Sequence, residues 1–303
     1  MAGLKMLLDP TRMGRGAEAL EDDLRKRIVG QDQAIRQVVD VYQTHLAGMS
    51  SPGRPIGSML FLGPTGSGKT RTVEAMAESL FGDPQAVIKI DCAEFQHSHE
   101  IAKLIGSPPG YLGHRETRPL LSQETLNQFY TDDLKLSFVL FDEIEKASDA
   151  LWNLLLGILD KATLTLGDNR RVDFSRAIIF MTSNLGAAEM NAILRPRLGF
   201  ATAAAGLNAQ TAEQMSRAGV DAARRKFTPE FMNRLDAVVA FNPLGDTELR
   251  RILDLELDAV RLRVAQAIDG EQLTLAISDT AKEFMLAEGT DTRYGARHLR
   301  RAV

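Results

Sequence analysis

The chain has 303 residues, of which 44% are hydrophobic and 25% are charged, and its formal net charge is −4. This is the composition of a globular protein that can bury a sizeable core. The single cysteine excludes an intrachain disulfide, and no segment reaches the roughly 18 apolar residues that cross a bilayer. We therefore expect a cytoplasmic protein of two domains, or of one domain with a lobe. The acidic balance argues against a general nucleic-acid binder.

The N-terminal quarter combines a leader with an amphipathic helix. Residues 1–20 are expected to form a loose leader. Apolar residues then recur at three- and four-residue steps from Ile35 to Leu46. This spacing puts them on one face of a helix, which the segment SSPGRPIGS ends.

Five short apolar runs follow, at residues 59–62, 86–90, 138–141, 177–182 and 237–241. They are continuous rather than alternating, which is typical of parallel strands buried on both faces. Alternation with helical segments predicts an α/β fold with a doubly wound sheet. The pattern changes near residue 242, where a helical stripe from Leu249 to Val264 begins. We expect a large α/β subdomain over 21–242 and a small, mostly helical lobe over 243–303. That lobe has one candidate strand at 273–277, and the Ala-rich stretch 200–214 is expected to be a weakly ordered insertion.

A glycine-rich segment, GPTGSGKT, lies between the first apolar run and a helical pattern. Glycines let such a loop turn its backbone N–H groups toward phosphate oxygens, and the following helix adds its positive dipole end. Lys69 would reach the β- and γ-phosphates and Thr70 would bind Mg²⁺. The alternative is a βα turn without a ligand. The expected phosphate-binding residues are Gly63, Pro64, Thr65, Gly66, Ser67, Gly68, Lys69 and Thr70.

Polar residues also follow two later strands. Asp142 and Glu143 end the run FVLF, where open α/β sheets bind ligands. Asp142 suits the Mg²⁺ shell, and Glu143 suits polarising an attacking water. The alternative is a solvated acidic start of a helix. Asn184 ends another run and could position water or contact the γ-phosphate, although an asparagine there is commonly a turn residue.

These motifs resemble the AAA+ module of the Clp unfoldases and disaggregases, above all the second, C-terminal ATPase module of the ClpB and ClpC type. The resemblance covers about Leu24 to Arg301. The matching strings, in the family's order, are VGQDQAI, RPIGSMLFLGPTGSGKT, LIGSPPGYLG, FVLFDEIEKA, VDFSRAIIFMTSNLG, FTPEFMNRLD and YGARHLRR.

The resemblance implies a P-loop NTPase with a five-stranded parallel sheet flanked by helices. Lys69 and Thr70 then match Walker A, Asp142 and Glu143 match Walker B, and Asn184 matches the polar sensor. Arg234 matches an arginine finger that acts on ATP in the neighbouring subunit, and Arg297 matches the second sensor. Ile28 and Val29 match residues that cradle adenine. On spacing alone, Arg234 would instead pair with Asp236 or Glu230, and Arg297 would be a solvated helix charge.

The resemblance also assigns loops. The family's substrate-gripping pore loop is matched by Gly110, Tyr111, Leu112 and Gly113. The ring of Tyr111 offers a broad apolar face that can hold any extended chain. The alternative for Tyr111 is packing beneath a surface loop. Residues 165–174 occupy the position of a lower pore loop but depart from its pattern. Leu198, Gly199 and Phe200 resemble a peptidase-docking tripeptide, or else anchor their own loop.

Taken together, the motifs predict an ATP-dependent protein unfoldase that uses ATP and Mg²⁺. We expect it to act as a homo-hexamer that threads polypeptide through a pore, with a Clp-type peptidase or an adaptor as a further partner. Two alternatives are a nucleotide-dependent remodeller or loader of nucleic acid, and an ATP-switched scaffold with little hydrolysis. Compared with the family, we expect the chain to lack further N-terminal domains, and the small lobe to be shortened at Val303.

Overall fold

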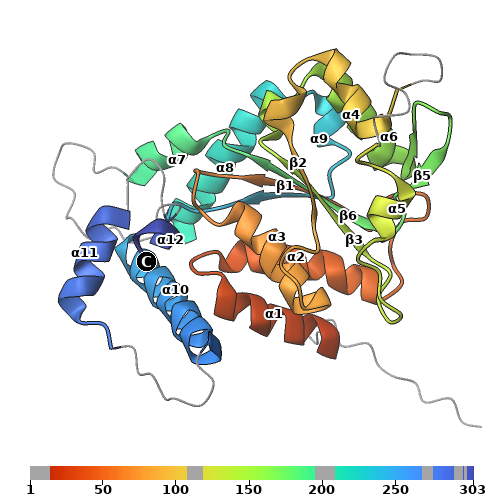
Figure 1. The fold of residues 1–303 in the computed structure, drawn as a ribbon. Coiled ribbons are helices and arrows are strands. Elements are labelled where there is room, and N and C mark those ends of the chain that lie inside the picture. The colour runs from red at the N-terminus through yellow and green to blue at the C-terminus, as the bar shows by residue number, and fades with distance from the viewer. Residues whose placement is uncertain (1–13, 108–118, 195–208, 268–275, 290–295, 297–298) are drawn as a thin grey trace, which may run out of the picture.

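The computed structural model describes residues 14–107, 119–194, 209–267, 276–289, 296 and 299–303. Its centre is a five-stranded sheet in the order β2-β3-β6-β1-β7, and every neighbouring pair is parallel (Figure 1). The strands are β1 (Gly57–Leu62), β2 (Ile88–Asp91), β3 (Ser137–Asp142), β6 (Ala177–Ser183) and β7 (Ala237–Ala240). All five predicted strands are thereby confirmed, and so is the α/β fold class.

The central strands β1 and β6 are mostly apolar because both faces of the sheet are covered. Every residue of β1 and of β6 is buried. Leu60 belongs to the hydrophobic cluster on one face, while Phe61 belongs to the cluster on the other. Phe61 packs against Phe180 and Phe241 with ring centroids 5.6 and 4.9 Å apart. The polar residues of these two strands are buried as well, namely Ser58, Thr182 and Ser183.

Helices from different parts of the chain cover the two faces. One face packs against α1 (Arg15–Arg27), α2 (Asp32–Leu46) and α3 (Lys69–Phe81), which lie together in Figure 1. The other face packs against α4 (Ala102–Ile105), α5 (Gln123–Asn127), α6 (Asp149–Lys161), α8 (Ala209–Lys226) and α9 (Pro229–Met232). Helix α7 (Ala187–Leu194) follows β6, and the hairpin of β4 (Thr163–Thr165) and β5 (Arg171–Asp173) follows α6.

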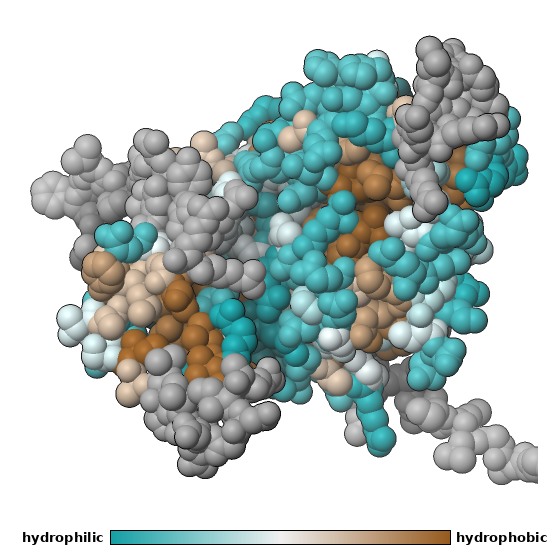
Figure 2. Space-filling model, in the orientation of Figure 1, coloured by the Kyte–Doolittle hydropathy of each residue, from teal (hydrophilic) through white to brown (hydrophobic). Residues whose placement is uncertain are grey.

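The last described part of the chain is helical, with α10 (Asp246–Ala267), α11 (Asp279–Gly289) and α12 (Leu299–Ala302). Leu253, Leu257 and Leu299 form a third, small cluster. Apolar side chains remain exposed on these helices, as Figure 2 shows, with Leu262 and Phe284 exposed by 64% and 67%. This helical part therefore has a much smaller core than the sheet.

Two expectations need correction. Residues 15–20 belong to α1, where Ala17 and Leu20 are buried, so the expectation of a loose leader is wrong for them. Residues 209–214 belong to α8, so the expectation of a weakly ordered insertion is wrong there. Of the candidate strand 273–277, residues 276 and 277 are not in a strand and the rest lie outside the described residues. In the part of the chain that the structure describes, every helix is too short or too polar to cross a membrane.

Candidate nucleotide-binding site

The glycine-rich loop joins β1 to α3 at the carboxyl edge of the sheet. Gly63 has a φ of +148°, and a Cβ there would lie 2.5 Å from the carbonyl oxygen of Phe241, so only glycine fits. Gly68 has a φ of +101°, and a Cβ there would meet nothing within 4 Å. The loop is thus closed against the sheet on one side and open on the other, at the N-terminus of a 13-residue helix.

Lys69 lies folded back under this loop. Its side chain is buried, and its Nζ donates to the carbonyl oxygens of Gly63 and Pro64 at 2.6 and 2.9 Å. Nζ also donates to Oδ1 of Asn184 at 3.0 Å. Burial lowers the pKa of Lys69 to about 8, although the carboxylates of Asp142, Glu145 and Glu143 oppose this shift. Burial therefore destabilises the charged form of Lys69, and the negative charge of a bound phosphate would stabilise it.

This pKa predicts a pH-dependent nucleotide affinity. Bound phosphate favours the ammonium form of Lys69, so above about pH 8 binding must take up a proton, and affinity falls as pH rises. We expect the Kd for ADP to rise about tenfold per pH unit above pH 8 and to stay flat between pH 7 and 8. Titrations with a fluorescent ADP analogue would measure this. Lys69→Arg is the control, because arginine stays charged and its profile should be flat. A flat wild-type profile up to pH 9.5 would contradict the prediction.

The acidic residues at the end of β3 are held by a threonine of β6. The hydroxyl of Thr182 donates to Oδ1 of Asp142, and the backbone N–H of Glu143 donates to the same hydroxyl oxygen at 3.0 Å. Glu143 has a φ of +55°, a left-handed conformation that non-glycine residues rarely adopt. Such backbone strain persists only where the surroundings enforce it. Thr182 is one of the groups that fix Asp142 and Glu143.

Asn184 connects the glycine-rich loop to the acidic edge. Its Oδ1 accepts from Lys69 and, at 3.3 Å, from the hydroxyl of Thr65. Its Nδ2 donates to Oε1 of Glu143 at 3.3 Å, and its backbone N–H donates to Oε1 of Glu145 at 3.0 Å. The other carboxylate oxygen of Glu143 pairs with Lys146. That hydrogen bond raises the pKa of Lys146. The structure therefore brings Lys69, Asn184 and Glu143 together.

The sequence analysis did not identify Thr182 and Glu145 as site residues. Both lie within the strings MTSN and DEIEKA, which end or follow buried strands. The available signal was that Thr182 and Glu145 lie within two residues of the predicted site residues Asn184 and Glu143. Their roles become visible only through hydrogen bonds that join residues about 40 positions apart.

The residues fit a nucleotide with Mg²⁺. The hydroxyl of Ser67 is buried and has no hydrogen-bond partner in the structure, as expected of a group that serves a ligand. Among the described residues, no three His, Cys, Asp or Glu side chains are grouped to hold a metal. Mg²⁺ commonly takes one or two protein oxygens and completes its shell with phosphate and water. Thr70 and Asp142 are the residues that would hold it, and it would neutralise charge on the phosphates.

Ile28 and Val29 lie between α1 and α2 and are exposed by only 6% and 7%. The backbone N–H of Ile28 donates to the carbonyl oxygen of Leu24 and so caps α1, which ends at Arg27. These two buried apolar residues precede Gln31, whose side chain donates to the carbonyl oxygen of Ser67 in the glycine-rich loop, called the phosphate loop from here on. Their predicted contact with adenine stays a prediction.

Arg234 follows α9, at the opposite end of the strands from the glycine-rich loop. Its guanidinium pairs with Asp160 at 2.7 Å and with Glu230 at 2.8 Å. The residue spacing suggested Glu230 or Asp236 as the partner of Arg234. Glu230 is confirmed, whereas Asp236 instead accepts from the backbone N–H and the hydroxyl of Ser58.

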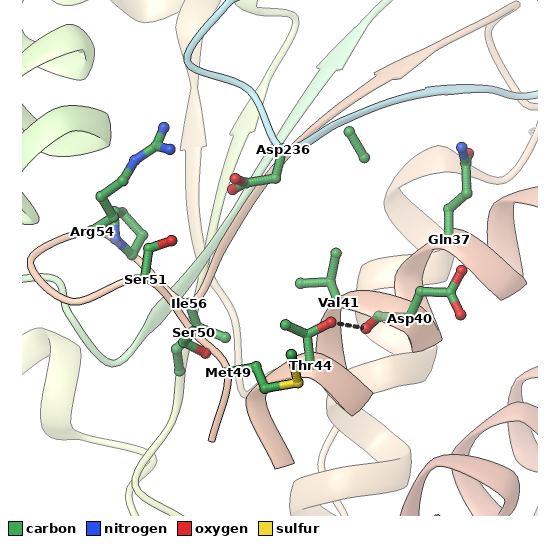
Figure 3. Close-up of a pocket in the computed structure, with 12 residues that line it drawn as sticks. Gln37, Asp40, Val41, Thr44, Met49, Ser50, Ser51, Arg54, Ile56 and Asp236 are labelled. Atoms are coloured by element: carbon green, nitrogen blue, oxygen red, sulfur yellow. Dashed lines mark hydrogen bonds between the residues drawn. The ribbon is translucent and has the colours of Figure 1, made fainter. Parts of the chain in front are cut away.

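Arg54 and Asp236 line a polar cavity of about 370 Å³, shown in Figure 3. Arg54, on one wall, donates to the carbonyl oxygen of Arg234 at 2.8 Å. Asp236, on another wall, is fixed to Ser58 at the start of β1. These contacts hold the segment that carries Arg234 against the sheet, and Arg54, like Thr182 and Glu145, is absent from the sequence analysis.

The two predicted pore loops begin side by side. The backbone N–H of Gly167, in the β4–β5 hairpin, donates to Ile105 at 2.8 Å. A Cβ on Gly167 would lie 2.5 Å from the carbonyl oxygen of Gly106, so the two backbones touch. Gly110, Tyr111, Leu112 and Gly113 lie outside the described residues, as do Arg297 and the tripeptide Leu198, Gly199 and Phe200.

The sequence of the large part matches a family model. The model described as "AAA domain (Cdc48 subfamily)" matches residues 54–238. The chain belongs to the AAA family. A second model, described as "C-terminal, D2-small domain, of ClpB protein", matches residues 244–303 of this AAA chain.

Relatives of this AAA protein carry Clp names. It is 40% identical to chaperone protein ClpB of Meiothermus ruber over 284 residues, which are 94% of this chain and 31% of that protein. It is 38% identical to the ATP-binding subunit ClpC of the ATP-dependent Clp protease of Staphylococcus epidermidis, covering 94% of this chain and 33% of that protein. The chain therefore spans about a third of the length of these relatives, and it is a second ATPase module of the ClpB and ClpC type.

Solved structures agree with this placement. An extended conformation of a Hsp104:casein complex from S. cerevisiae superposes with a TM-score of 0.77 at 32% identity, over 96% of this chain and 46% of that one. The Hsp104-ADP complex of the same organism gives 0.74 at 32% identity, over 94% and 45%.

Proposed function

We propose that this chain is an ATP-hydrolysing module that unfolds or remodels proteins. The observation that carries the proposal is the connection Lys69–Asn184–Glu143, which joins a phosphate-binding loop to a strained carboxylate. Phosphoryl transfer needs positioning and charge neutralisation more than covalent chemistry, and this arrangement offers both. ATP and Mg²⁺ are the proposed cofactors.

The proposed roles of Lys69, Glu143 and Asn184 draw on the hydrogen bonds between them, and those of the other residues draw on the family resemblance. Lys69 and the loop N–H groups bind phosphates, while Thr70 and Asp142 hold Mg²⁺. Glu143 polarises the attacking water, and Asn184 orients Glu143 with respect to Lys69. Arg234 serves the site of a neighbouring subunit, and Arg297 serves its own site.

Polypeptide is the proposed substrate. The relatives are named as chaperones and as a protease subunit, and one solved neighbour is a complex with casein. These names favour protein over nucleic acid as the substrate, and the complete carboxylate–amide–lysine arrangement favours hydrolysis over a passive switch. We further propose a homo-hexamer in the cytoplasm, with Leu198, Gly199 and Phe200 as the contact for a peptidase or adaptor.

The test of the substrate class is Tyr111→Ala. ATP hydrolysis should persist, while unfolding of a tagged fluorescent reporter should slow by roughly tenfold or more, because an aromatic contact contributes about 1.5–3 kcal/mol. Tyr111→Phe keeps the aromatic face and is the matched control. Reporter unfolding at the wild-type rate by Tyr111→Ala would remove Tyr111 from this role. A wild-type chain without ATPase activity would overturn the proposed function itself.

A further inference from the structure

Gln31 is a buried polar residue that the proposed chemistry leaves without a role. It precedes α2 at the N-cap position, yet its side chain does not cap that helix. The residue is only 2% exposed. A buried amide without partners would destabilise the fold, so its hydrogen bonds elsewhere must justify its position.

The amide of Gln31 joins two segments that are distant in sequence. Nε2 donates to the carbonyl oxygen of Ser67 at 3.0 Å and to that of Asn242 at 2.9 Å. Oε1 accepts from the backbone N–H of Asn242 at 2.9 Å. The amide can have only this orientation, since the two carbonyl oxygens need a donor and the N–H needs an acceptor. Both hydrogens of the amide are thus used.

The contact with Ser67 controls a phosphate-binding group. The carbonyl of Ser67 and the N–H of Gly68 belong to one planar peptide unit. A donor fixed on the carbonyl therefore fixes the direction of the N–H, and Gly68 lies on the open side of the loop. The pull of Gln31 on this carbonyl aims that N–H at the place where phosphate would lie.

The contact with Asn242 reaches the start of the C-terminal helices. Asn242 lies four residues before Asp246, where α10 begins. The neighbouring contacts are equally close. A Cβ on Gly30 would lie 2.8 Å from Cγ of Glu248, and Oε2 of Glu248 accepts from the N–H of Gly245 at 3.0 Å. The segment 28–31, the phosphate loop and residues 241–248 therefore meet at one point.

We propose that Gln31 is a positioning residue that couples the phosphate loop to the segment leading into α10. When phosphate accepts a hydrogen bond from the N–H of Gly68, the peptide unit reorients and moves the carbonyl of Ser67. The amide of Gln31 follows this carbonyl and thereby moves the N–H and the carbonyl of Asn242. The C-terminal helices thereby respond to nucleotide. This inference rests on the proposed nucleotide binding and deepens it.

The test is Gln31→Met in the full chain. Methionine has a similar length but forms none of the three hydrogen bonds. Gln33→Met is the matched control, because Gln33 lies two residues along the chain and is exposed. Two measurements are made: the Kd for a fluorescent ADP analogue, and the hydrogen exchange of residues 241–248 with and without saturating ADP.

We expect Gln31→Met to weaken ADP binding about tenfold, because the Ser67–Gly68 peptide unit loses the donor that orients it before ADP binds, and ADP must then order it at a cost of about one hydrogen bond. At saturating ADP, it should also lose the slower exchange that ADP causes at residues 241–248 in the wild type. Gln33→Met should behave as the wild type in both measurements. A merely structural role for Gln31 would lower thermal stability without removing the response of residues 241–248 to ADP.

Several results would overturn the proposal. Wild-type affinity in Gln31→Met would do so, and so would an unchanged response at residues 241–248 once ADP saturates the variant. A wild-type chain that binds ADP without any change at these residues would also overturn it and leave the proposed function intact. A wild-type chain that binds no nucleotide would refute the proposed function. If Gln31→Met fails to fold, Gln31→Asn keeps a neutral amide that is one methylene too short to reach both segments, and the same outcomes apply to it.

Discussion

Replacing Glu143 with glutamine should abolish ATP turnover and leave ATP binding intact. The change keeps the size of the side chain and its left-handed backbone, and Oε1 can still accept from Asn184. It removes the negative charge that would polarise water. General-base catalysis contributes about 10²–10⁴-fold, so phosphate release should fall by that factor.

Phosphate release and binding of a fluorescent ATP analogue are the two measurements for Glu143→Gln. Glu94→Gln is the control, because Glu94 is an exposed carboxylate in the short helical turn after β2. Glu143→Gln should trap the ATP-bound form of the chain. Turnover at the wild-type rate would assign the catalytic role to another group, and loss of binding would show that Glu143 shapes the phosphate site rather than the reaction.

The sheet could be predicted from the sequence because its strands are buried on both faces. Full burial forces continuous apolar runs, and each run stands out between helical segments. Helix α1 was missed because it buries few residues, among them Ala17 and Leu20, and its charged residues obscure the apolar spacing. The start of α8 was missed for a different reason. The Ala-rich stretch was interpreted by its low complexity, although alanine is the strongest helix former.

The candidate site also contains residues that local sequence predicts and residues that it does not. The phosphate loop is contiguous in sequence, and strand ends placed Asp142 and Asn184 at one edge, so local patterns were sufficient. Thr182, Glu145, Arg54 and Gln31 act through contacts with residues far along the chain. Gln31 alone joins positions 36 and 211 residues away. Nothing in the spacing of the chain indicates such a contact, because it depends on how the sheet and α2 pack together.

The largest predicted effect on the assembled protein comes from Arg234→Ala. An arginine supplied by a neighbouring subunit contributes roughly 10³–10⁵-fold to phosphoryl transfer, so ATP hydrolysis by the proposed ring should fall by about that factor. ATP binding should persist. The fold should persist too, because Asp160 and Glu230, the ion-pair partners of Arg234, are exposed by 38% and 63%, and pairs that reach solvent contribute about 1 kcal/mol. Arg217→Ala, which removes an exposed ion pair with Glu213, is the control.

A mixture of two inactive variants decides whether Arg234 acts between subunits. Arg234→Ala keeps Glu143 but supplies no finger, whereas Glu143→Gln supplies the finger but cannot turn over ATP. In a ring of head-to-tail contacts, about a quarter of the interfaces of a random equal mixture pair an intact Glu143 with an intact Arg234. The mixture should therefore recover activity that neither variant shows alone. If it stays inactive although mass measurements show mixed rings, then Arg234 acts within its own subunit, and its anchorage by Arg54 and Asp160 is structural.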